Sequence, residues 1–314
     1  MWRSLHGSTA APPDGATIVT IGNFDGVHRG HRHVLDRARE LATEIGGSQR
    51  LPVVAVTFEP HPMRVLAPAK APTQLCGLRR KIELLQENGA DEVYVLAFDA
   101  QLAAWSPVEF IDKVLAEDLR AAGVVVGANF HFGAKGSGDV ALLREQGRSN
   151  GFVVRGLDLS GDERPWSSTY VRTLIAGGDV ARASHVLGRL HALEGVIVEG
   201  DERGRAMGYP TANMPASMHD AVPADGVYAG YLRLQSDHTK RLPAAISVGS
   251  NPTFDGQDRR VESYVLDRDD LELYGLPVEV SFVDRVRGQI KFAGMDDLIK
   301  QMHADVEDVR ELLA

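Results

Sequence analysis

The first three fifths of the chain repeat one pattern of hydrophobic positions. From Thr17 to about Gly188, short apolar runs alternate with amphipathic stretches. The runs that we predict as strands are TIVTIG, LPVVAVTF, DEVYVLAF, GVVVGANF and GFVVRGLDL. After the first run, the apolar residues that recur at helical spacing are Val34, Leu35, Ala38, Leu41, Ala42 and Ile45. Buried strands that alternate with helices predict an α/β unit with a mostly parallel sheet covered on both faces.

After Gly188 the pattern changes, and one predicted strand follows another. These strands are LEGVIVEG, GVYAGYLRL, LPAAISVG, VESYVLD and LPVEVSFVDRV. Loops rich in glycine, proline and aspartate join them, which is typical of an antiparallel barrel or sandwich. A terminal helix follows, and the apolar residues that share its face are Leu298, Met302, Val306, Val309 and Leu313.

The length of 314 residues exceeds the usual size of a single core, so two domains are expected. We place the boundary where the pattern changes, which gives domains 1–187 and 188–314. No internal repeat is visible, so the two domains are different modules rather than copies.

Charge differs between the two predicted domains. There are 20 basic and 21 acidic residues before Gly188, against 14 basic and 22 acidic residues from Gly188 onward. The net charges are therefore about −1 and −8. Because binding to a phosphate backbone needs a basic surface, nucleic acid is not an expected partner. A single nucleotide remains a candidate ligand, since a few backbone N–H groups can hold its phosphates.

Cysteine content and the N-terminus indicate a cytoplasmic protein. Cys76 is the single cysteine, so it can form no intramolecular disulfide, and we expect a small buried residue there. The first 15 residues lack the apolar stretch of a signal peptide and are expected to form a loose arm. No apolar run approaches the roughly 18 residues that span a bilayer, so no membrane partner is expected.

The stretch GNFDGVHRGHRHVL, residues 22–35, joins the first strand to the first helix. A strand, a glycine turn and a helix start in this order point unpaired N–H groups at an anion. His28 and His31 are close to one helical turn apart, so both rings can face the turn and donate to phosphoryl oxygens. The glycine spacing fits neither a dinucleotide-binding fingerprint nor a P-loop. Alternatively, the glycines only make a turn and the histidines are exposed, which is the interpretation we adopt for His33.

Three further segments are ambiguous when taken alone. GDERGRAMGYPTANM, residues 200–214, is a glycine-containing turn that runs into a strand. VESYVLD is a strand in which alternation puts Glu262 and Tyr264 on one face, where Glu262 could be an ordinary solvent-facing carboxylate. SSTYVR, residues 167–172, is a helix N-cap with an arginine one turn on.

Taken together, these motifs resemble one family. GNFDGVHRGH is similar to the HIGH-type nucleotidyltransferase motif of bacterial bifunctional riboflavin kinase/FAD synthetases. VTFEPHP, VGANFHFGAKGSGD and SSTYVR follow in that family's order. PTAN, at residues 210–213, resembles the riboflavin kinase signature, and DGVYAGYL, SVGSNPTFDG, VESYVLD, LYG and VRGQIKF come after it. The resemblance implies a Rossmann-like nucleotidyltransferase module followed by a riboflavin kinase β-barrel with a terminal helix.

For the first module the resemblance implies adenylylation of FMN by ATP, which yields FAD and pyrophosphate. His28 and His31 would contact the ATP phosphates. The other residues implied in ATP and phosphate binding are Gly22, Phe24, Gly30, Asn129, Ser168, Thr169 and Arg172. Asp25 could serve the metal indirectly, although an aspartate before glycine is equally a turn residue.

For the second module the resemblance implies transfer of the γ-phosphate of ATP to riboflavin, with Glu262 as general base. Thr211 and Asn213 would bind Mg²⁺ and the ATP phosphates, because that ion prefers oxygen ligands. Gly204 and Gly208 would let the preceding loop approach the nucleotide. Arg287 matches a family arginine that binds ATP or flavin, but a salt bridge explains it equally well.

Two alternatives remain. A HIGH-type transferase for another phosphorylated acceptor, such as a cytidylyltransferase or pantetheine-phosphate adenylyltransferase, would leave the PTAN barrel without a task. A flavin-binding regulator without turnover would be favoured by loss of His28, His31 or Glu262, and all three are present.

Overall fold

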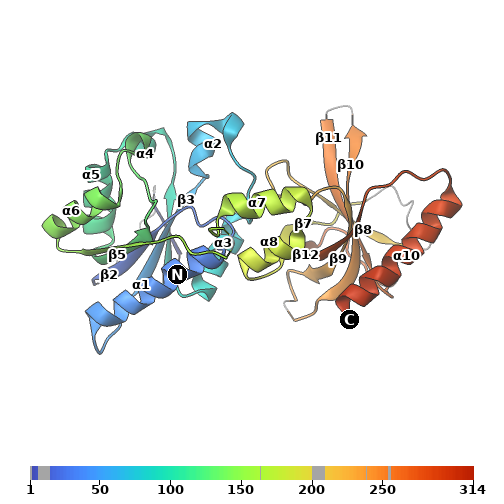
Figure 1. Ribbon diagram of the computed structural model, residues 1–314, viewed down its shortest axis with the longest axis horizontal. Coiled ribbons are helices and arrows are strands. Elements are labelled where there is room, and N and C mark those ends of the chain that lie inside the picture. Colours follow the sequence, from blue (N-terminus) through green and yellow to red (C-terminus); the bar gives the residue numbers. More distant parts are fainter. Residues whose placement is uncertain (1, 6–14, 163, 200–208, 238, 254–255) are drawn as a thin grey trace. The chain divides into compact units, whose positions relative to one another are not determined.

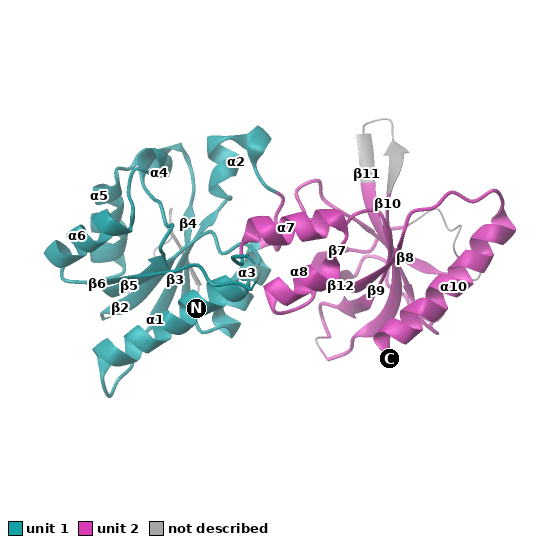
Figure 2. Ribbon diagram, in the orientation of Figure 1, with its two compact units in different colours: residues 1–72, 78–166 teal, residues 73–77, 167–314 magenta. Residues whose placement is uncertain are grey.

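The chain folds into two compact units. The computed structural model describes residues 2–5, 15–162, 164–199, 209–237, 239–253 and 256–314. One unit consists of Met1–Pro72 and Leu78–Trp166, and the other of Thr73–Gly77 and Ser167–Ala314 (Figure 2). In the part of the chain that is described, no helix is both long and apolar enough to cross a membrane.

The first unit is built on a six-stranded sheet in the order β1-β4-β3-β2-β5-β6. Figure 1 labels β2, β3 and β5 among its strands. Every neighbouring pair of these strands is parallel. The strands are β1 Trp2–Leu5, β2 Thr17–Ile21, β3 Val53–Glu59, β4 Glu92–Ala97, β5 Ala121–Gly127 and β6 Val153–Leu157. All five strands predicted for this part are present, which confirms the parallel α/β class.

Strand β1 was not expected, because the N-terminal stretch was predicted to be a loose arm. That prediction was wrong for residues 2–5, which pair in parallel with β4. Without β1, the outer edge of β4 would expose unpaired N–H and C=O groups. Four residues are too few to show the alternation that marks a strand in a sequence.

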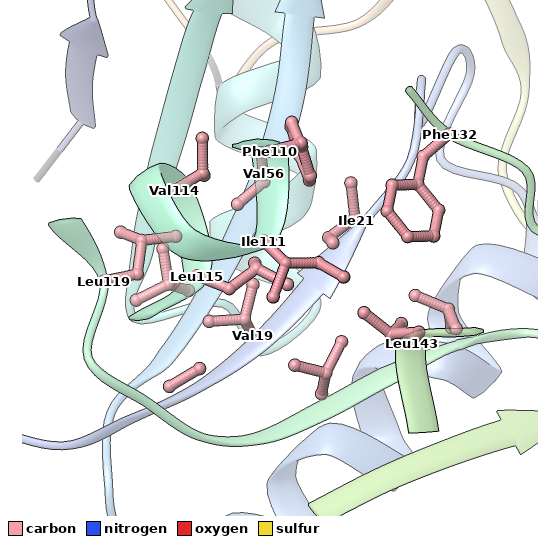
Figure 3. Close-up of a cluster of buried hydrophobic side chains, with 14 of the residues drawn as sticks. Val19, Ile21, Val56, Phe110, Ile111, Val114, Leu115, Leu119, Phe132 and Leu143 are labelled. Atoms are coloured by element: carbon pink, nitrogen blue, oxygen red, sulfur yellow. The ribbon is translucent and has the colours of Figure 1, made fainter. Parts of the chain in front are cut away.

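Helices cover both faces of the parallel sheet. They are α1 Arg29–Gly46, α2 Pro62–Leu66, η1 Pro68–Lys70, α3 Leu78–Glu87, α4 Ala100–Ala104, α5 Pro107–Phe110, η2 Ile111–Asp118, η3 Ala134–Gly136 and α6 Val140–Asn150. Because side chains alternate along a strand, Ile18 packs with Leu41 of α1 while Val19 packs with Ile111 of η2 on the other face (Figure 3). The predicted apolar face of α1 is buried except at Val34, which is half-buried, and at Ile45 in the last turn, which is 39% exposed.

The second unit contains an antiparallel, curled sheet in the order β7-β12-β9-β10-β11-β8. The strands are β7 His191–Val196, β8 Thr211–Pro215, β9 Gly226–Leu234, β10 Leu242–Thr253, β11 Gly256–Val265 and β12 Pro277–Gly288. Just beyond β7, the amide of Val198 donates to the carbonyl of Asn213 in β8 at 2.9 Å. The sheet therefore curls until its two edge strands meet, which confirms the predicted barrel-like class.

Among the described residues of the second unit, the helices are α7 Ser168–Gly177, α8 Val180–Leu187 and α10 Met295–Leu313. Val306 and Val309 of α10 pack on Ala229 and Leu266 of the sheet region, as the terminal helix pattern predicted. Val180 of α8 is fully buried in the core of the curled sheet. Cys76, in the short segment Thr73–Gly77, is half-buried rather than buried.

Candidate active sites

The turn between β2 and α1 has unusual backbone geometry. Phe24, Gly26 and Val27 have φ values of +48°, +79° and +39°. Positive φ is rare for a phenylalanine and disfavoured for a β-branched valine, so surrounding contacts must hold the turn in place. Phe24 and Val27 are buried, and the Val27 amide donates to the Phe24 carbonyl at 3.1 Å. Residues held in such conformations cluster at functional sites.

The two histidines of this segment lie together. His28 is the residue before α1, and its ring stacks on that of His31 with 3.7 Å between centroids and 24° between planes. The edge of the Phe24 ring lies 5.1 Å from the His31 ring. His28 is buried, whereas His31 is half-buried at the surface of the turn. His33, which we expected to be exposed, is half-buried.

Two glycines of the motif are required by close approach and not only by the turn. A Cβ atom on Gly30 would lie 3.1 Å from the His28 ring and 3.3 Å from the carbonyl oxygen of Trp166. A Cβ atom on Gly22 would lie 3.3 Å from the Phe24 ring. Larger residues at these positions would crowd the His28 ring of the pair and the Phe24 ring beside it.

Strand order places this turn where ligands bind in open α/β sheets. The chain proceeds from β2 to β3 and β4 on one side, and then returns to β5 on the other side of β2. The carboxyl ends of β2 and β5 therefore form the topological switch point. Gly22 follows β2 directly, and Asn129 is exposed in the turn two residues after β5. The structure thus brings Asn129 to the sheet edge that carries the histidines.

Aromatic side chains that sequence reasoning missed lie near the same carboxyl edge. Phe58, Phe98, Trp105 and Phe130 are half-buried and pack against the core of the first unit. The Phe58 and Phe98 rings are 5.8 Å apart and nearly perpendicular. Phenylalanines at or just after the ends of β3, β4 and β5 were the signal, but only the strand order shows that these ends are neighbours.

Ser168, Thr169 and Arg172 belong to α7 in the second unit. Ser167 caps this helix as predicted, because its hydroxyl accepts a hydrogen bond from the Tyr170 amide at 3.2 Å. Nε of Arg172 donates to the carbonyl of Thr73 at 2.6 Å. Participation of these three residues in the site of His28 and His31 stays a prediction.

In the second unit, the register of β8 and β11 brings predicted site residues together. Asn213 is directly opposite Glu262, and Thr211 is directly opposite Tyr264. Residues in such pairs have Cβ atoms about 5 Å apart and, with period-two alternation, all four share one face of the sheet. The neighbours Ala212, Met214, Val261 and Val265 point to the other face and form its core.

Asn213 is buried, and its amide Nδ2 donates to the carbonyl of Thr211 at 3.2 Å. Oδ1 is then the atom of that amide that suits a cation. Among the described residues, no group of three or more histidines, cysteines, aspartates and glutamates could hold a metal ion. The oxygen donors of Thr211 and Asn213 fit Mg²⁺, which is commonly bound through few protein ligands plus substrate phosphates. Gly204 and Gly208 lie outside the described residues.

Arg287 forms a bidentate ion pair with Asp305 of α10. Its Nε and Nη2 atoms donate to the two carboxylate oxygens at 2.7 and 2.6 Å. The side chains of Arg287 and Asp305 are only 19% and 6% exposed. This contact is the salt bridge that the sequence left open as an alternative, and here it is largely buried. A contact between Arg287 and ATP or flavin stays a prediction.

The first unit carries a histidine pair at its switch point, and the second carries a carboxylate beside hydroxyl and amide oxygens. Residues 11–170 match the family model of FAD synthetase, and residues 187–313 match that of riboflavin kinase. The chain belongs to the family of bifunctional riboflavin kinase/FMN adenylyltransferases.

Relatives from distant bacteria match nearly the whole chain. The bifunctional riboflavin kinase/FMN adenylyltransferase of Escherichia coli K12 is 38% identical over 98% of this chain and 96% of the relative. The protein of the same name from Bacillus subtilis 168 is 31% identical over 93% and 91%. A crystal structure described as a macrolide-efflux protein from Streptococcus pneumoniae has a TM-score of 0.88 and 30% identity over 98% of both chains. The assignment to the family rests on the family models and the curated relatives, and the crystal structure from Streptococcus pneumoniae supports the fold.

Proposed function

We propose that this chain makes FAD from riboflavin in two steps, with ATP as co-substrate in both. The C-terminal unit phosphorylates riboflavin to FMN. The N-terminal unit then transfers the adenylyl group of a second ATP to FMN and releases pyrophosphate. Family membership supports the pair of activities, and the geometry of the two sites supports the roles of the residues below.

In the kinase site, Glu262 is the general base. The observation that carries this role is the register in which Glu262 is opposite Asn213, beside the pair of Thr211 and Tyr264. The 5′-hydroxyl oxygen of riboflavin bonds to the γ-phosphorus of ATP, the bond from that phosphorus to the oxygen of ADP breaks, and Glu262 takes the hydroxyl proton. A neutral alcohol needs such a base because it is a poor nucleophile.

Thr211 and Asn213 would hold Mg²⁺ through the Thr211 hydroxyl and Oδ1 of Asn213. When bound there, Mg²⁺ neutralises charge on the ATP phosphates. The two residues lie two positions apart on β8, on the face that carries Glu262. The same strand thus orients the nucleotide, while β11 supplies the base.

In the adenylyltransferase site, the nucleophile is the phosphate of FMN. A phosphate monoester has its second pKa near 6, so it is already an anion at neutral pH and needs no general base. One of its oxygens bonds to the α-phosphorus of ATP, and pyrophosphate leaves. His28 and His31 stabilise the charge on the transferred group, and Gly30 permits the stacked arrangement of their rings.

Other proposed contacts involve residues at the carboxyl edge of the parallel sheet and residues of α7. Asn129 contacts the nucleotide, and Phe58, Phe98 and Phe130 offer an apolar, aromatic surface to a flavin ring. Ser168, Thr169 and Arg172 bind the ATP phosphates, as the family resemblance implies. The proposal includes a cytoplasmic location and small-molecule partners only, in keeping with the net charge of −9 and the single cysteine.

Purified protein with riboflavin, ATP and Mg²⁺ should accumulate FMN and then FAD, separated by chromatography. His28→Ala and His31→Ala should each lower FAD formation from FMN at least a hundredfold and spare FMN formation. Glu262→Gln should lower FMN formation by a similar factor and spare FAD formation from supplied FMN. His33→Ala, a histidine on the same helix outside the pair, is the control. Equal loss of both activities in every variant would contradict two separate sites.

A further inference from the structure

Helix α10 covers only part of the sheet face that carries the kinase residues. The apolar cluster under the helix contains Ala229 of β9 and Leu266, and Tyr264 of β11 packs against it. Glu262 precedes Tyr264 by two residues on β11 and lies on the same face. Two residues of a strand span about 7 Å. Tyr264 therefore marks the border between the helix-covered part of this face and the row of Glu262 and Asn213.

Tyr209 stands on the same border and contacts both sides of it. Its ring packs edge-on against Tyr264 with 5.0 Å between centroids. Its hydroxyl is hydrogen-bonded to Nδ1 of His303 in α10, and the two rings are 5.4 Å apart. Tyr209 is only 6% exposed, so its ring is fixed between Tyr264 and His303.

The start of β8 needs an anchor of this kind. Pro210 separates Tyr209 from Thr211, and a proline has no N–H to donate to a neighbouring strand. The first paired residue of β8 is Thr211, opposite Tyr264. Tyr209 thus fixes the chain immediately before the two residues that would bind Mg²⁺.

We propose that Tyr209 and His303 are positioning residues of the kinase reaction: their hydrogen bond ties the start of β8 to α10 and so keeps Thr211 and Asn213 aligned with Glu262. The inference rests on the proposed function of these three residues. FMN formation would then depend on α10 as well, although this helix carries none of the residues proposed to bind Mg²⁺ or to act as the base.

The test uses Tyr209→Phe and His303→Leu, which both remove the hydrogen bond, and His303→Asn, whose amide can replace Nδ1 as a partner. Tyr209→Phe and His303→Leu should each raise the Mg²⁺ concentration for half-maximal FMN formation and lower kcat/KM for ATP about five- to tenfold, the effect of one hydrogen bond. The double variant should be no worse than either single one, because both remove the same contact. His303→Asn should recover most of the activity.

Arg310→Ala is the matched control on the same helix. Arg310 holds α10 through two hydrogen bonds to Asp267, at 2.6 and 2.7 Å, and takes no part in the hydrogen bond between Tyr209 and His303. Its loss should leave the Mg²⁺ and ATP dependence of FMN formation unchanged. The proposal would be overturned if Arg310→Ala changed the Mg²⁺ and ATP dependence of FMN formation as much as His303→Leu does. It would also be overturned if His303→Leu left that dependence unchanged. Should Tyr209→Phe fail to fold, His303→Leu and His303→Asn test the proposal by themselves: equal FMN formation in these two variants would contradict a role for the hydrogen bond. Failure of the unmodified protein to form FMN would instead overturn the proposed function.

Discussion

His28 and Glu262 meet different chemical demands, and their surroundings differ accordingly. His28 is buried, stacked on a second imidazole and held against a helix start, which suits a fixed donor to a phosphoryl oxygen. Glu262 is half-buried on β11, opposite Asn213 and on the face that also carries Thr211. A carboxylate can take the proton of a substrate hydroxyl, which is the task of a general base.

His191 shows the opposite case, a titratable group placed in the core. It is 1% exposed, its Nε2 atom donates to the carbonyl of Ala221 at 2.8 Å, and its ring stacks on Phe282. Burial, and to a lesser extent the charge of Arg189, lower its pKa to about 4, whereas the hydrogen bond to Ala221 opposes the shift. The folded state therefore keeps this imidazole neutral at physiological pH.

From that shift follows a pH dependence of stability. The unfolded chain binds a proton at His191 near pH 6.5 and the folded chain near pH 4, so stability is full above pH 6.5 and is lost as the pH falls toward 4. The loss can reach about 3 kcal/mol. His191→Gln keeps a donor for Ala221 but does not titrate, so its thermal stability should change less over this range. His185→Gln, at an exposed histidine of α8, is the control. If the thermal stability of His191→Gln changed with pH as steeply as that of the unmodified protein, the prediction would be contradicted.

At the residue scale, the sequence predicted the pairing of His28 with His31 because both lie on one helical turn. It could not predict that a Cβ atom on Gly30 would be crowded by the His28 ring and the Trp166 carbonyl, because Trp166 is distant in sequence. For the same reason Asp305, which pairs with Arg287, was visible only as one acidic residue of an amphipathic helix. Contacts between residues far apart in the chain leave no periodic signal.

At the scale of elements, α10 is held to the sheet by a polar contact as well as by its apolar face. Asp305 accepts hydrogen bonds from Arg287 of β12 and from Gln301 one turn earlier, at 2.9 Å. A buried carboxylate without its guanidinium partner is costly, on the order of 3–5 kcal/mol, whereas an exposed pair contributes about 1 kcal/mol or less.

Arg287→Met should therefore weaken the docking of α10. We expect amide hydrogen exchange in α10 to speed up markedly, and a smaller change when Arg268→Met breaks the exposed pair with Asp270. Arg287→Met with Asp305→Leu should recover part of the protection, because no buried charge is left without a partner. Equal protection in Arg287→Met and the unmodified protein would contradict the prediction. FMN formation that falls in the double variant despite recovered protection would indicate the nucleotide or flavin contact implied by the family resemblance.

Strong periodicity allowed most elements to be predicted from the sequence, and the exceptions are short or irregular. The five predicted strands of the first unit and the two long helices, α1 and α10, had clear apolar periods. Residues 111–118 form a π-helix, in which the amide of Leu119 donates to the carbonyl of Val114, and no local pattern distinguishes this from an α-helix. Strand β1 depends on the edge of β4, whose paired residues lie 91 positions away in the sequence.

At the scale of the molecule, chain order and packing divide the protein at different places. The change of pattern predicts domains 1–187 and 188–314, whereas α7 and α8 pack with the curled sheet. Val180 of α8 is buried in the core of that sheet, and the hydroxyl of Ser184 accepts a hydrogen bond from the amide of His191. Arg285 of β12 further donates to the carbonyl of Gly177, the last residue of α7, at 3.5 Å.

A fragment that begins at Ser167 should thus be a more stable kinase than one that begins at Gly188. The shorter fragment would expose the sheet surface under Val180, Ala183 and Leu187, which are buried in the full chain. Each such side chain contributes roughly 1–3 kcal/mol when buried, so the loss should amount to several kcal/mol. Thermal unfolding should show a lower Tm for 188–314, and FMN formation should survive to a higher temperature in 167–314. Val180→Ala in the longer fragment should give an intermediate Tm, since it removes part of the same contact. Equal Tm values for the two fragments would instead place the folding unit at Gly188, as the sequence pattern alone predicts.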